Sequence, residues 1–103
     1  MNILLTVQPA AAPAAPIKGT SVEATYQRVS AEPEAGDAVV VTSVRFELDP
    51  ALKGSIALPD AAAPEVQVAV LAVDGSKLLT RTVTAQNGNA VLALSAADVQ
   101  LMV

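Results

Sequence analysis

The fold is decided by residues 65–77, which read EVQVAVLAVDGSK. Val66, Val68 and Val70 alternate with polar or small residues such as Gln67, and this period of two is typical of a strand that buries one face. Aromatic residues make up only 2% of the 103-residue chain, so β-branched strands of this kind have to supply most of the core. The segment therefore predicts β structure with a buried valine face.

Downstream, two turn signals continue the pattern. Asp74-Gly75 predicts a tight hairpin turn into a strand over Lys77–Ala85, and Asn87-Gly88 predicts a second turn into Ala90–Leu94. We therefore expect Val66–Leu94 to form a three-strand antiparallel meander.

Upstream, three further segments show the spacing of strands. Thr20–Arg28 and Ala38–Leu48 alternate over most of their length, and Ser55–Leu58 is a short apolar run. Glu32–Asp37 contains proline and glycine and predicts a turn between the first two. Val39–Val41 is apolar on both faces, so we expect both sides of that strand end to be covered.

About seven short strands, with turns roughly every 8–12 residues, are typical of a sandwich or barrel. We expect a single all-β domain over residues 17–103: a small antiparallel β-sandwich, immunoglobulin-like or jelly-roll-like. The predicted core is Val40, Val44, Phe46, Val66, Val68, Val70, Leu79, Val83 and Leu92.

Residues 1–16 are expected to form an extended Pro/Ala-rich N-terminal arm. Its three prolines exclude a helix and favour an extended polyproline-like chain. Two hypotheses remain open for the apolar stretch Ile3–Val7: it adds as a strand to a neighbouring subunit's sheet, or it pairs within its own sheet. On the first hypothesis, the partner-binding residues are Ile3, Leu4, Leu5, Val7, Pro9, Pro13 and Pro16.

The C-terminal residues also leave two alternatives. Ser95–Asp98 has the spacing of a helix capping box, which predicts one helical turn. Val99–Val103 could equally be a final strand. Because this stretch is apolar and uncharged, it belongs either to the core, which we favour, or to an interface.

Charge and composition argue against nucleic-acid binding. The net charge is −4, and the six Lys and Arg residues are scattered along the sequence without a basic run. Phosphate neutralisation needs clustered basic residues, and base stacking needs aromatic rows. We expect no direct contact with nucleic acid.

Catalytic parts are also missing from the sequence. The chain contains no histidine and no cysteine, which excludes Ser-His and Cys-His nucleophilic sites and the usual zinc sites. Glu32, Glu34 and Asp37 share one turn, but their spacing does not match a calcium loop, so we interpret them as a solvated acidic turn. We predict a protein that is not an enzyme and that needs no cofactor or metal.

These features favour a non-catalytic structural or interaction subunit of a large protein assembly, and in particular a small virion component such as a capsid decoration or tail accessory protein. Its partners would be other protein subunits, including copies of itself. The rival hypothesis is a secreted or cell-surface β-sandwich adhesion module.

The apolar start Met1–Val7 bears on localisation. It has no basic residue ahead of it, unlike a signal peptide, and it is too short to span a bilayer. We therefore expect synthesis in the cytoplasm, incorporation into a virion or other particle, and no membrane insertion. An extracellular location is the alternative if a leader has been removed.

Overall fold

The computed structural model describes residues 1–30 and 38–103, and these ranges are mostly β structure. They contain seven strands and one short helix: β1 (Ile3–Pro9), β2 (Ser21–Val29), β3 (Val39–Glu47), β4 (Gly54–Leu58), β5 (Ala61–Leu71), β6 (Lys77–Thr84), β7 (Asn89–Leu94) and α1 (Ala96–Gln100). The all-β class and the expected number of strands are thus confirmed.

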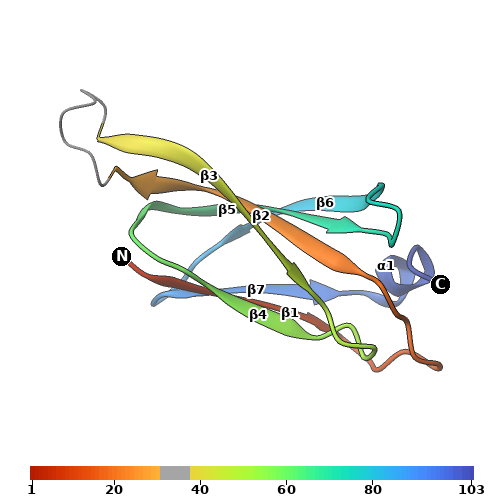
Figure 1. The fold of residues 1–103 in the computed structure, drawn as a ribbon. Coiled ribbons are helices and arrows are strands. Elements are labelled where there is room, and N and C mark those ends of the chain that lie inside the picture. The colour runs from red at the N-terminus through yellow and green to blue at the C-terminus, as the bar shows by residue number, and fades with distance from the viewer. Residues whose placement is uncertain (31–37) are drawn as a thin grey trace.

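The strands form two sheets, which Figure 1 shows as two layers. The four-stranded sheet has the order β3-β2-β5-β6, and the three-stranded sheet has the order β4-β1-β7. The chain changes sheet at four of its six strand connections, β1–β2, β3–β4, β4–β5 and β6–β7. Buried apolar side chains from both sheets form one core cluster.

β1 is the central strand of the three-stranded sheet, so the expected arm over residues 1–16 is wrong for its first half. β1 runs antiparallel to β4 and parallel to β7. The side chains of Ile3, Leu5 and Val7 are at most 1% exposed. A strand with a neighbour on each side has its backbone groups satisfied within the molecule. Pairing within the chain's own sheet is therefore the correct hypothesis for Ile3–Val7.

The hairpin predicted at Asp74-Gly75 is confirmed, since it joins the antiparallel strands β5 and β6. Gly75 has a φ of +86°, which glycine adopts without strain. The Asp74 carboxylate accepts hydrogen bonds from the Ser76 hydroxyl (2.6 Å) and the Ser76 N–H (2.9 Å), and these bonds lower the pKa of Asp74.

The predicted three-strand meander is wrong at its last strand. β7 does not pair with β6; it lies in the other sheet and pairs in parallel with β1. Around the turn at Asn87-Gly88, only Gln86 and Asn89 are bridged. Alternation predicts which side chains of a strand face the core. Because both sheets face the same core, it does not predict to which sheet the strand belongs. The parallel pair is also a departure from the expected antiparallel arrangement.

The predicted core is largely buried. Val66, Val68, Val70, Leu79 and Leu92 are at most 7% exposed. Three further predicted members are half-buried and pack against the core cluster: Val44, Phe46 and Val83.

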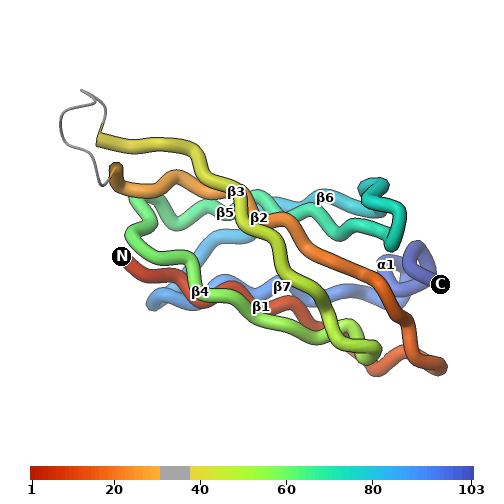
Figure 2. The backbone as a smooth tube through the Cα atoms, viewed as in Figure 1, coloured from red at the N-terminus to blue at the C-terminus, as the bar shows by residue number. Residues whose placement is uncertain are grey.

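Val40 is the predicted core residue that is wrong, because it is 42% exposed. In Figure 2, the yellow N-terminal end of β3 is the part of that strand farthest from the three-stranded sheet. Its other end is packed closely, since a Cβ on Gly54 of β4 would lie 3.0 Å from the side chains of Phe46 and Leu48. Val40 has the predicted orientation, but a side chain with that orientation is buried only where the three-stranded sheet lies beneath it.

The C-terminal stretch forms the helix α1. Its predicted capping box is present: the Asp98 N–H donates to the Ser95 hydroxyl oxygen (3.2 Å), and the Ser95 N–H donates to the Asp98 carboxylate (3.0 Å). Val99 and Met102 are each 9% exposed and belong to the core cluster, whereas Val103 is exposed. The stretch is therefore helical up to Gln100, and Val99 of α1 and Met102 just after it pack against the core.

The central position of β1 makes a stability prediction. Leu5→Ala should reduce the free energy of unfolding by about 2–5 kcal/mol, because it leaves a cavity at a fully buried site. Leu4→Ala is the matched control, since Leu4 is 46% exposed on the opposite face of the strand and should cost less than about 1 kcal/mol. Urea unfolding followed by circular dichroism measures both, and equal losses would contradict the orientation of β1.

Candidate interaction surfaces

The described residues contain no group of three or more acidic side chains that could hold a metal ion. The acidic turn with Glu32, Glu34 and Asp37 lies outside the described residues. None of the helices in the described ranges is long and apolar enough to cross a bilayer. The features that distinguish the described surface are apolar.

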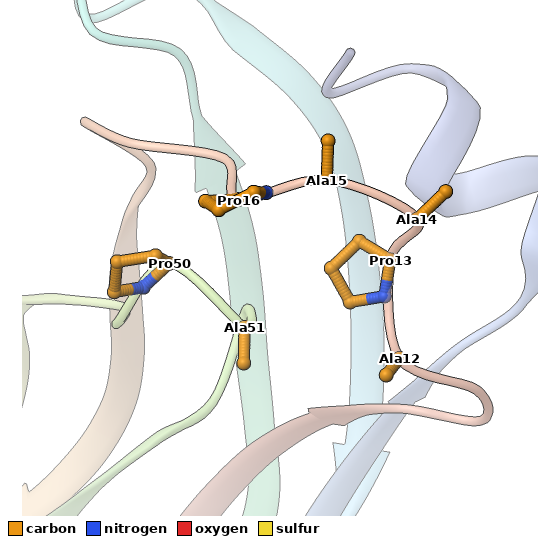
Figure 3. A pocket seen from close by; sticks show the side chains of 7 residues that line it. All are labelled: Ala12, Pro13, Ala14, Ala15, Pro16, Pro50 and Ala51. Atoms are coloured by element: carbon orange, nitrogen blue, oxygen red, sulfur yellow. The ribbon is translucent and has the colours of Figure 1, made fainter.

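A hollow of about 260 Å³ lies beside the Pro/Ala segment, by which we mean Ala10–Pro16. Figure 3 shows its lining, which is Ala12, Pro13, Ala14, Ala15, Pro16, Pro50 and Ala51. None of these side chains has a polar atom or a titratable group. The hollow therefore offers apolar contact and no acid–base chemistry.

A second hollow, the apolar groove, has a volume of about 360 Å³ and lies between the Pro/Ala segment and α1. It is lined by Pro13–Ile17 together with Val99, Gln100, Met102 and Val103. Gln100 is the one lining residue with a polar side chain. The two hollows share Pro13–Pro16, so this segment presents apolar surface toward both.

The Pro/Ala segment is held by the rest of the chain at both ends. The Ala10 N–H donates to the Leu94 carbonyl (2.8 Å), and the Ile17 N–H donates to the Pro50 carbonyl (2.9 Å). The segment thus connects β1 to β2 across the end of the core. Prolines restrict the unfolded chain, so little conformational entropy is lost when such a connection becomes ordered.

The wall of the groove that α1 provides is fixed by an ion pair. An Arg81 guanidinium nitrogen on β6 lies 2.9 Å from the Asp98 carboxylate, whose side chain is only 11% exposed. The same carboxylate accepts the N-cap hydrogen bond from Ser95. Asp98 therefore anchors the helix both to its own first turn and to the four-stranded sheet.

The outward-facing side of the three-stranded sheet, which we call the neutral face, carries no charge. In fact, none of the residues of β1, β4 and β7 is charged. Leu4 is 46% exposed and Val91 is 49% exposed. Thr6 lies opposite Val91, which makes Leu4 a diagonal neighbour of Val91 on the same face. The remaining outward side chains are Thr6, Gln8, Ser55, Ala57, Asn89 and Ala93.

A second group of exposed apolar side chains, the valine end, lies where β2 ends and β3 begins. Val29, Val39 and Val40 are 42–47% exposed, and Val41 is 73% exposed. The expectation that Val39–Val41 is covered on both sides is wrong within the described part of the chain. β3 is the edge strand, and its first residues lie away from the second sheet.

The residues predicted to bind a partner are divided between core and surface. Ile3, Leu5 and Val7 are in the core and are not available to a partner. The others are placed as follows: Leu4 on the neutral face, Pro9 at the end of β1 opposite Leu94, and Pro13 and Pro16 beside the hollows. Sequence reasoning missed Val91, although its alternation with the buried residues of β7 was a usable signal.

Comparison with protein-family models, with curated proteins and with solved structures finds no match to this chain. The functional argument therefore depends on these surfaces.

The Asp98 anchor predicts a specific loss of stability. Asp98→Ala should reduce the free energy of unfolding by about 1–3 kcal/mol, because it removes the carboxylate that accepts the Ser95 N–H in the capping box and leaves the Arg81 guanidinium without its partner. Asp74→Ala is the control, since that carboxylate binds only within an exposed turn. Urea unfolding compares the two variants, and a loss for Asp98→Ala no larger than the loss for Asp74→Ala would contradict the role of the ion pair.

Proposed function

We propose that this protein is a non-catalytic interaction subunit of a large protein assembly and that the neutral face contacts another protein subunit. The uncharged surface of the three-stranded sheet is the observation that carries the proposal. Charged residues make up 16% of the chain, and all of them lie outside β1, β4 and β7, in the other sheet, the connections and α1. Desolvating a face without charges avoids the largest penalty of binding.

The opposite outer surface has a different character. The four-stranded sheet carries a Glu23–Arg45 ion pair and a row of exposed threonines on β6, Thr80, Thr82 and Thr84. Polar and charged side chains of this kind suit a face that remains in water. The contrast between the two sheets favours the neutral face as the contact surface.

For the fold, we propose an immunoglobulin-like β-sandwich. Seven strands divided between sheets of four and three, with connections that cross between the sheets, resemble that arrangement more than an eight-stranded jelly roll. The assignment of strands to sheets departs from the immunoglobulin pattern, in which the first, second, fourth and fifth strands form the four-stranded sheet, because here that sheet contains β2, β3, β5 and β6. Sandwich folds serve many functions, so the proposed function depends on the surface and not on the fold.

We further propose that the assembly is a virus particle, in which the protein serves as a capsid decoration or tail accessory subunit after synthesis in the cytoplasm. Small contact faces of modest affinity suit a lattice, because many copies act together. The lack of histidine and cysteine supports a structural over a catalytic role. Copies of the protein itself and other particle subunits are the proposed partners.

The proposal is tested with purified particles. Particles of the virus that carries the gene, separated on a density gradient, should contain the protein at a fixed ratio to the major coat protein, as measured by quantitative mass spectrometry. Finding the protein only in the free fraction would contradict the proposal, and a secretion leader ahead of Met1 would favour the adhesion-module alternative.

The neutral face is tested by adding protein variants to particles that lack the protein. Leu4→Lys combined with Val91→Lys should weaken binding at least tenfold, or about 1.4 kcal/mol, because it places charge in the desolvated contact. Thr80→Lys combined with Thr82→Lys is the matched control on the opposite outer surface and should bind like the wild type. Equal binding of the two double variants, measured by co-sedimentation, would exclude the neutral face as the contact.

A further inference from the structure

β3 forms an edge of the four-stranded sheet, and among the described strands it pairs with β2 alone. The Leu48 N–H donates to the Thr20 carbonyl (2.9 Å), and the Ser30 N–H donates to the Ala38 carbonyl (2.8 Å). Antiparallel strands alternate between hydrogen-bonded and non-hydrogen-bonded pairs, so the even-numbered residues of β3 direct their backbone groups toward β2. The odd-numbered residues of Val39–Glu47 therefore direct theirs toward the open edge.

β6 forms the opposite edge of the same sheet and is protected against pairing with a further strand, whereas β3 is not. β6 carries Lys77, and its Arg81 lies on the inner face of the strand, which discourages another strand from pairing there. The first six residues of β3, Val39–Val44, carry no charge, and its three leading valines are exposed. A long β-branched edge of this kind is a site for strand addition.

We propose that β3 of a second copy of this protein covers the edge, pairing antiparallel about a two-fold axis through Ser43. Ser43 is the middle residue of β3, so this register pairs the whole strand. Because a two-fold contact uses the same surface twice, the strand has to be compatible with itself in charge.

This register meets that requirement. The Arg45 residue of each copy lies opposite Val41 of the other, and Glu47 lies opposite Val39, so no charged residue of β3 faces a like charge. Val40, which is 42% exposed, lies opposite the half-buried Phe46 of the other copy. The two four-stranded sheets then form one continuous sheet, and the exposed valines of β3 gain cross-strand neighbours from the other copy.

The inference rests on the proposed function, because it names one partner of the interaction subunit. It uses the β3 edge, whereas the test of the proposed function uses the neutral face of the other sheet. The two can therefore fail independently.

The register predicts opposite effects for two charges at one position. Val41→Lys places an ammonium opposite Arg45 of the other copy, whereas Val41→Glu places a carboxylate there. Both changes remove the same valine from a site that is 73% exposed, so both variants should fold, which circular dichroism checks. Sedimentation equilibrium should give a dimer Kd for Val41→Lys at least tenfold larger than for Val41→Glu.

A single cysteine tests the position of the axis, and the chain has no native cysteine to interfere. Directly opposed residues in a hydrogen-bonded pair have Cα atoms about 5.5 Å apart, within the range that a disulfide spans. Ser43→Cys should therefore form a covalent dimer under mild oxidation at least tenfold faster than Thr80→Cys, which places its cysteine at an exposed site on β6.

A wild-type protein that stays monomeric up to about 1 mM would overturn the inference. Equal dimerisation of Val41→Lys and Val41→Glu would overturn it as well, as would equal cross-linking rates for the two cysteine variants. If these results came with intact binding to particles through the neutral face, the proposed function would stand without the dimer. Dimerisation through β3 by a protein that binds no particle would support the dimer and contradict the proposed function.

Discussion

The placement of β1 between β4 and β7 is the constraint on which the rest of the structure depends. From this position, β1 places Ile3, Leu5 and Val7 in the core. Because β4 and β7 each pair with β1, neither of these flanking strands has a partner in the sheet without it. Its parallel partner β7 lies near the other end of the sequence, and the sheet can form only when the two ends of the chain meet. Such non-local pairing is slow to form, because the closure of a long loop has to come before the contacts that stabilise it.

Both proposed contact surfaces follow from this arrangement. The inner side of β1 fills the core, so its outer side, with Leu4, becomes the middle of a rigid uncharged face. At the other layer, β3 diverges from the three-stranded sheet toward its first residues, which leaves Val39–Val41 exposed at an open edge. A core built almost without aromatic side chains needs many β-branched residues, and some of them remain at the surface where the layers do not overlap.

Local patterns predicted much of this fold. Alternation correctly placed Val66, Val68 and Val70 of β5 in the core, Asp74-Gly75 predicted the hairpin, and Ser95–Asp98 predicted the cap of α1. What alternation cannot supply is the sheet to which a strand belongs, which is why β7 was assigned to β6 and residues 1–16 to an arm. The exposure of Val40 depends on where the second layer ends. The partner-binding role of Ile3, Leu5 and Val7 failed for the same reason, since an apolar strand suits a core and an interface equally well.

The most direct test of this account is amide hydrogen exchange of the wild-type protein, followed residue by residue by NMR. If β1 is the central strand, the amides of Leu5 and Val7 should exchange only through global unfolding, with the same free energy as the most protected amides of β5. Exchange of the β1 amides within minutes, while Val68 in β5 stays protected, would show that residues 3–9 detach from the folded domain. That result would contradict the central place of β1 and, with it, the rigid neutral face.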